Sequence, residues 1–121
     1  MPNRLPLGVV PVLLVCTAVT GCSESKGSSS GLSVTSTDST CDVSSTSLSA
    51  GTHTFTVTNK GKDATEVYVY GDGDKVIGEV EDVGPGLSRD LKVKLAAGSY
   101  SIACKPGQKG DGIRTPITVT G

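Results

Sequence analysis

Four cysteines carry the most versatile side-chain chemistry in this chain of 121 residues: Cys16, Cys22, Cys41 and Cys104. A cysteine sulfur can be acylated, can form a disulfide or, as a thiolate, can bind a metal ion. Which of these applies depends on the residues around each sulfur and on the redox state of the compartment in which the protein works.

The segment Val19-Thr20-Gly21-Cys22 resembles a lipobox, the site at which bacterial lipoproteins are cleaved and acylated. Arg4 supplies the positively charged n-region of a signal peptide, and residues 9–19 form an apolar stretch that is too short to span a bilayer. We therefore expect a lipoprotein signal peptide over residues 1–21. Cys22 should then carry diacylglycerol and a further acyl chain such as palmitate, followed by a flexible tether to residue 31. The expected location is the extracytoplasmic face of a bacterial cell membrane.

Processing leaves Cys41 and Cys104 as the free cysteine pair in an oxidising compartment. If the two sulfurs are bonded, closure of the loop between them stabilises a small domain by about 4 kcal/mol on the chain-entropy model. If they stay reduced, both thiolates can bind a metal ion together with a nearby carboxylate. The sequence leaves both possibilities open.

Apolar and polar residues alternate in several stretches, and no stretch has the 3.6-residue period of a helix. The alternation is clearest over residues 54–58, 67–70, 91–95 and 117–120. Turn-forming sequences separate these stretches, among them Asn59-Lys60-Gly61, Gly84-Pro85-Gly86 and Lys105-Pro106-Gly107. The pattern predicts an all-β sandwich of seven to eight short strands in one domain, residues 32–121.

Counting chain reversals predicts which side chains share an end of the sandwich. If every turn reverses the chain, Cys41, Glu66, Cys104 and the loop 105–114 converge at one end. That loop contains Asp111, whose carboxylate, like that of Glu66, is a hard oxygen donor that suits ferric or divalent ions. Further carboxylates toward this end are Glu79, Glu81 and Asp82.

Several functions are disfavoured by composition. Loss of Arg4 with the signal peptide leaves ten of the 11 basic residues against 12 acidic ones, so the mature chain has a charge near −2 and no basic patch for nucleic acid. The single histidine, His53, begins a strand that rises toward the predicted site, and six residues at about 3.3 Å each place it roughly 20 Å away. No nucleophile and base are paired, and we therefore expect no enzyme activity.

The arrangement of Asn59-Lys60-Gly61, Glu66 and Cys104-Lys105-Pro106-Gly107-Gln108 resembles the cupredoxin pattern, in which a strand end and the loop after a cysteine hold copper. A closer resemblance, over residues 32–121, is to the N-terminal cupredoxin-like domain of the EfeO family of iron-uptake lipoproteins. It rests on Thr65-Glu66-Val67-Tyr68-Val69-Tyr70, Gly84-Pro85-Gly86-Leu87-Ser88-Arg89-Asp90-Leu91 and Gly110-Asp111-Gly112-Ile113-Arg114. The resemblance implies a cupredoxin-like Greek-key sandwich in a membrane-anchored, metal-binding module of an iron-uptake system. Its expected partners are an iron permease or another envelope component.

The sequence departs from a copper cupredoxin at the ligands. A blue-copper site needs two imidazoles, a thiolate and usually a weak axial thioether. Glu66 stands where the first histidine would be, Gln108 stands near the second, and the only methionine, Met1, leaves with the signal peptide. We expect no blue-copper site.

The predicted metal site therefore consists of Glu66, Cys41, Cys104 and Asp111, for an iron or copper ion. The alternative is a structural or interaction β-sandwich lipoprotein with a Cys41–Cys104 disulfide and no metal.

Replacement of Cys22 by Ser should prevent acylation, because serine has no sulfur to form the thioether. An unprocessed or mislocalised precursor should accumulate, whereas the wild-type chain should partition with membranes and begin at residue 22. Mass spectrometry of the mature N-terminus checks this result. A wild-type protein that begins with an unmodified residue other than Cys22 would contradict the prediction.

Overall fold

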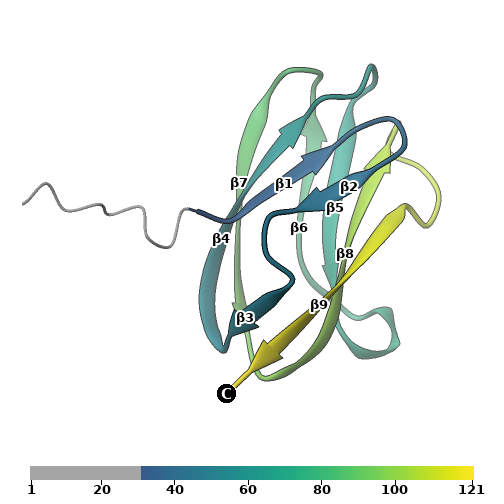
Figure 1. Cartoon of the computed structure of the whole chain (residues 1–121). Coiled ribbons are helices and arrows are strands. Elements are labelled where there is room, and N and C mark those ends of the chain that lie inside the picture. The colour runs from purple at the N-terminus through teal and green to yellow at the C-terminus, as the bar shows by residue number, and fades with distance from the viewer. Residues whose placement is uncertain (1–30) are drawn as a thin grey trace, which may run out of the picture.

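Nine strands in two layers make up the computed structural model, which describes residues 31–121 (Figure 1). The expected signal peptide, the acylation site Cys22 and the tether up to residue 30 lie outside the described residues. Within the described part there is no helix long and apolar enough to cross a membrane. The all-β sandwich predicted from the alternating pattern is confirmed.

One layer is a four-stranded sheet with the strand order β2-β1-β4-β7. Its strands are β1 (Ser33–Ser36), β2 (Cys41–Val43), β4 (Gly51–Asn59) and β7 (Ser88–Leu95). Strands β1 and β4 run parallel, and the other neighbours are antiparallel.

The second layer is a five-stranded sheet with the strand order β3-β9-β8-β5-β6. Its strands are β3 (Ser47–Ser49), β5 (Thr65–Tyr70), β6 (Val76–Val83), β8 (Gly98–Pro106) and β9 (Ile113–Thr120). A short 3-10 turn, η2 (Asp72–Asp74), joins β5 to β6. Strand β3 pairs in parallel with β9, so the end of β9 lies beside β3 (Figure 1). The count exceeds the expected seven to eight because β1, β2 and β3 are short Ser- and Thr-rich strands with weak alternation.

The core lies between the sheets and consists mostly of aliphatic side chains. Its fully buried members include Phe55, Leu95, Ile102 and Ile117. In the C-terminal part of β4, β7 and β9, every second residue is buried and the residues between them face outward. This is the two-residue period of a strand that is buried on one face.

The two ends of the sandwich carry different residues, as the count of reversals predicts. One end, which we call the disulfide end, contains Cys41, Cys104, the Asn59–Thr65 loop and the loop 107–112. The strand register places them together, since Ser36 lies opposite both Cys41 and Asn59, and Thr65 lies opposite Pro106. The opposite end, which we call the hairpin end, contains His53, the loop 71–75 and the turn 96–98.

A buried asparagine holds the loops of the disulfide end together. The side-chain amide of Asn59 donates to the carbonyl oxygens of Asp63 (2.7 Å) and Val83 (2.8 Å), and its oxygen accepts the amide hydrogen of Gly61 (2.8 Å). Asn59 is 1% exposed. A buried polar group without a partner is costly, and this one side chain satisfies the buried carbonyl of Val83 together with two part-buried backbone groups.

Replacement of Asn59 by Ala should lower the free energy of unfolding by roughly 2–4 kcal/mol, because it removes three hydrogen bonds and leaves the buried carbonyl of Val83 without this partner. For a domain of this size, that loss corresponds to a fall in Tm of about 10 °C or more. Thermal unfolding followed by circular dichroism measures the change. The neighbouring exposed residue provides the control, since Lys60→Ala should leave Tm within about 2 °C. Equal Tm values for Asn59→Ala and wild type would contradict this account.

Candidate functional site

Cys41 and Cys104 form a disulfide that joins the two sheets. Their Cα atoms are 5.4 Å apart, and the bond connects β2 at the edge of one sheet to β8 in the middle of the other. Both residues are buried, with exposed fractions of 6% and 0%. Of the two possibilities that the sequence left open, the structure contains the disulfide, so neither sulfur is available as a thiolate in this state.

Glu66 lies at the same end of the five-stranded sheet as the disulfide, but its side chain is on the outer face of that sheet, whereas the disulfide is on the inner face. Thr65 and Val67 are fully buried and point into the core, whereas Glu66 is half-buried and faces outward, with its backbone opposite that of Lys105. Cys104, one residue before Lys105, points into the core. Because successive side chains of a strand face opposite sides, the sheet itself separates the Glu66 carboxylate from the two sulfurs.

The inward position next to Glu66 belongs to Thr65, which has a partner of its own. Its hydroxyl lies 2.9 Å from the hydroxyl of Ser36 across the interface between the sheets, and both residues are 0% exposed. A neutral pair of hydroxyl groups therefore occupies the space beneath the end of β5.

Asp111 lies in the exposed loop between β8 and β9. Gly110 and Gly112 on either side have positive φ angles of 76° and 79°. A Cβ at Gly112 would lie 2.8 Å from the carbonyl oxygen of Cys104, so only glycine fits at that position. The loop therefore turns sharply against β8 and holds Asp111 at the surface, on an element that neither carries Glu66 nor forms the disulfide.

Gln108 and His53 each have a structural partner. The side-chain oxygen of Gln108 accepts the backbone amide hydrogen of Asp82 at 2.9 Å, which ties the 107–112 loop to β6. The Nε2 atom of His53 lies 2.7 Å from the carbonyl oxygen of Ser49 at the hairpin end. The structure thus brings Cys41 and Cys104 together, but it does not gather Glu66 and Asp111 around them as the four-residue prediction requires.

The carboxylates that do lie near Glu66 surround the hydroxyl of Tyr68 on the outer face of the five-stranded sheet. The Tyr68 oxygen is 3.5 Å from Oε2 of Glu66 and 3.4 Å from Oε1 of Glu81. Glu79 lies directly opposite Tyr68 on β6. Interaction with the Glu79 carboxylate, followed by desolvation and the charges of Glu66 and Glu81, raises the pKa of Tyr68 above its usual range.

The carboxylates around Tyr68 also influence the pKa of Glu81. The charge of Glu79 is the main cause that raises the pKa of Glu81 above its ordinary value. We call Glu66, Tyr68, Glu79 and Glu81 the glutamate cluster. Sequence reasoning placed Glu66 and the β6 carboxylates at one end of the sandwich but omitted Tyr68. The two-residue spacing of Glu66 and Tyr68 on one strand is the signal that could have joined them.

Positive charge on this outer face lies over aromatic rings. The Tyr68 and Tyr70 rings are stacked with centroids 5.4 Å apart, and the ammonium of Lys105 lies 4.1 Å from the Tyr68 centroid. The guanidinium of Arg114 lies 4.4 Å from the Tyr70 centroid and 2.7 Å from a carboxylate oxygen of Asp74. These cation–π contacts cover part of the stacked rings and hold Lys105 and Arg114 against the outer face.

A family model described as a cupredoxin-like domain matches residues 9–119 of the sequence. The chain belongs to this cupredoxin-like family. No curated protein matches the sequence.

Solved structures share the fold at low sequence identity. Reduced auracyanin from the photosynthetic bacterium Roseiflexus castenholzii is 17% identical, with a TM-score of 0.58 over 74% of this chain and 95% of that chain. An azurin from Methylomonas sp. strain J is 19% identical, with a TM-score of 0.54 over 74% and 96% of the two chains. A multicopper oxidase is 13% identical, with a TM-score of 0.51, and the match covers 72% of this chain and 40% of the oxidase. These likenesses establish the fold alone.

The residues at the disulfide end do not fit a blue-copper centre. Such a centre needs two imidazole nitrogens and a thiolate. The only histidine of the chain, His53, lies at the hairpin end, and the sulfur of Cys104 is bonded to Cys41. Among residues 31–121 there is also no group of three or more His, Cys, Asp or Glu side chains arranged to hold a metal ion.

In the native protein that has not been reduced, Cys41 and Cys104 should resist alkylation even after denaturation, because both sulfurs are bonded. Reduction should lower the free energy of unfolding by about 4 kcal/mol, since the bond closes a loop with a sequence separation of 63 residues. Mass spectrometry after alkylation and thermal unfolding with and without reductant measure the two effects. Alkylation of both thiols in the unreduced protein would overturn the assignment.

Proposed function

We propose that the protein is a lipid-anchored, extracytoplasmic module of an EfeO-type iron-uptake system, and that any metal ion it takes is bound by oxygen atoms rather than by sulfur. The observation that carries this proposal is the Cys41–Cys104 disulfide, which removes the thiolate on which copper electron transfer would depend. The lipobox-like segment ending at Cys22 supports the anchor, and the residues shared with the EfeO domain support the uptake system.

The oxygen donors of this proposal are those of the glutamate cluster. Carboxylate and phenol oxygens are hard donors that suit ferric and other highly charged ions better than a thioether or thiol does. The carboxylates repel one another, as the raised pKa of Glu81 indicates, and a bound cation would relieve this repulsion. Glu66 is the central contributor in this scheme, because it is half-buried whereas Glu79 and Glu81 are exposed.

An iron permease or another envelope component of the same system is the proposed partner. The anchor would keep the domain close to the membrane, where a weak contact with a second anchored protein gains from a high effective concentration. Under this proposal the protein delivers or presents an ion and catalyses no reaction.

A second candidate is an interaction module that binds no metal. The absence of a preformed group of three ligating side chains within residues 31–121 favours it. The disulfide and the cation-covered tyrosines would then serve to make a rigid surface for another envelope protein. The two candidates differ in one measurable property, which is saturable metal binding.

Calorimetric titration of the oxidised full chain with ferric, cupric and cuprous ions separates the candidates. The proposal expects saturable binding of ferric or cupric ion, without the intense absorption of a copper thiolate. Glu66→Gln should weaken that binding at least tenfold, because it removes the charge while keeping the size and polarity of the side chain. Asp111→Asn should have a smaller effect, since Asp111 lies outside the glutamate cluster.

Asp90→Asn is the matched control, because Asp90 is an exposed carboxylate on β7 of the other sheet. It should bind as the wild type does. A ligand that binds only the folded state must also raise Tm, which gives a second readout. Failure of all three ions to bind, with unchanged Tm, would reject the metal proposal in favour of the interaction module. Equal affinities of wild type and Glu66→Gln would remove Glu66 from the site.

A further inference from the structure

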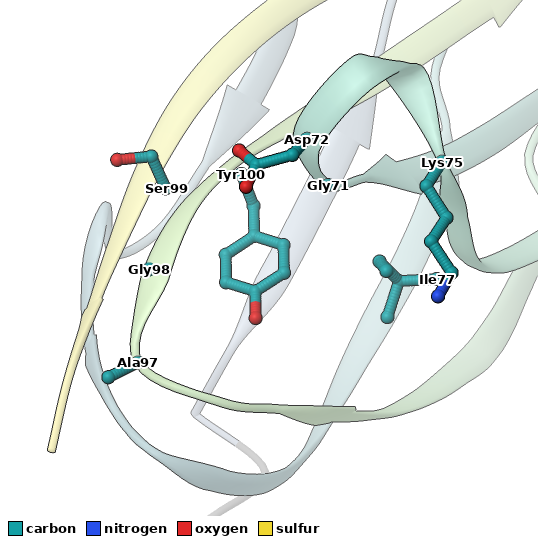
Figure 2. A pocket seen from close by; sticks show the side chains of 8 residues that line it. All are labelled: Gly71, Asp72, Lys75, Ile77, Ala97, Gly98, Ser99 and Tyr100. Carbon is teal, nitrogen blue, oxygen red and sulfur yellow. The ribbon is translucent and has the colours of Figure 1, made fainter.

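A hollow at the hairpin end lies outside everything assigned so far. It opens between the loop 71–75, which joins β5 to β6, and the turn that joins β7 to β8 (Figure 2). Its volume is about 220 Å³, and it is lined by Gly71, Asp72, Lys75, Ile77, Ala97, Gly98, Ser99 and Tyr100. The disulfide and the loop with Asp111 belong to the opposite end of the sandwich.

The ring of Tyr100 lies at the centre of this hollow, between the segment 97–99 and Ile77 (Figure 2). Its hydroxyl donates to the carbonyl oxygen of Ala96 at 2.7 Å, which fixes the orientation of the ring. Glycines border both edges. A Cβ at Gly71 would lie 3.7 Å from one edge carbon of the ring, and a Cβ at Gly98 would lie 3.8 Å from another. The two glycines therefore place no side chain on these edges of the ring, whereas another part of the ring packs against the hydrophobic core.

Two charged side chains stand at the rim of the hollow. Asp72 provides a carboxylate acceptor and Lys75 an ammonium donor. The hydroxyl of Ser99 points away from the ring, because Ser99 and Tyr100 are successive residues of β8 and face opposite sides of the sheet (Figure 2). The opposite charges of Asp72 and Lys75 leave the rim with no net charge. A ligand that presents several neutral hydroxyl groups can use both of these charged partners, whereas an ion would be attracted by one and repelled by the other.

The wall formed by the loop 71–75 is held in place. The amide of Gly71 donates to the carbonyl oxygen of Lys75 at 2.8 Å, and the amide of Lys75 donates to the carbonyl oxygen of Asp72 at 3.2 Å. Outside the hollow, the ion pair of Asp74 with Arg114 ties the same loop to β9. The hollow is therefore preformed, as small-molecule sites usually are.

We propose that this pocket binds one neutral sugar ring, a pyranose, stacked on Tyr100. The face of an aromatic ring is electron-rich and attracts the weakly positive C–H groups on the flat side of a sugar. The sugar hydroxyls then reach Asp72 and Lys75. The volume is below the roughly 300–1,000 Å³ of pockets for drug-sized ligands, which limits the site to about one ring. Because the pocket is open on one side, the affinity is millimolar, and the pocket recognises the terminal unit of a glycan.

Titration of the full ¹⁵N-labelled chain with glucose, galactose, mannose and N-acetylglucosamine tests this proposal by nuclear magnetic resonance. At least one sugar should give saturable shifts of the amides in residues 71–75 and 97–100, while those in 107–112 stay fixed. Ala97→Gln should weaken binding at least tenfold, because the longer side chain occupies the pocket. Tyr100→Phe keeps the ring and should retain binding within about threefold.

Ala50→Gln is the matched control, since Ala50 is an exposed turn residue at the same end that does not line the pocket. It should bind as the wild type does. Glycine is the competing probe, because a zwitterion could bridge Asp72 and Lys75. Saturable shifts with glycine alone, absence of shifts with all four sugars, or sugar binding that Ala97→Gln does not weaken would each overturn the proposal.

Discussion

The bond between Cys41 and Cys104 is the constraint on which much of this sandwich depends. The core is small and contains one phenylalanine and no tryptophan, so burial of apolar surface contributes less than in a larger domain. The disulfide ties a three-residue edge strand, β2, to the central strand β8. The hydroxyl of Thr115 adds a second tie between the sheets by donating to the carbonyl oxygen of Cys41 at 2.6 Å. Strand β2 is thus fixed to the opposite layer through both its side chain and its backbone.

This bond also decides what chemistry is left at the disulfide end. In a cupredoxin-like fold, a reduced cysteine at the end of a strand could act as a soft metal ligand, but a disulfide sulfur has no thiolate to offer. Beneath the end of β5, Ser36 and Thr65 bond to each other, so no buried charge remains there. The interior of this end is therefore neutral, and the charged groups near it lie on the outer surface.

The outer face of the five-stranded sheet collects those charges in an ordered way. The glutamates lie around Tyr68. Arg114 lies at the level of Tyr68 along the strands, and its guanidinium passes over the Tyr70 ring to Asp74 in the loop 71–75 at the hairpin end. Lys105 lies over the rings and does not pair with a carboxylate within the described residues. Since a cation over an aromatic face is only partly neutralised, the face keeps both signs of charge in separate places. The two ends can therefore serve different ligands without competing.

The sequence alone determined the fold class, because alternating residues with turn-forming sequences between them leave few architectures besides a β-sandwich. It also placed Cys41, Glu66 and Cys104 at one end, since each turn reverses the chain. It could not decide on which face of the sheet each side chain lies, because the register between strands depends on pairing across the whole sheet. That register put Cys104 inside with Cys41, and Glu66 outside with Lys105. Likewise, only the packing of the loop 71–75 against the turn 96–98 placed Asp72 and Lys75 around Tyr100, because these segments are distant in sequence and meet only when the sandwich closes.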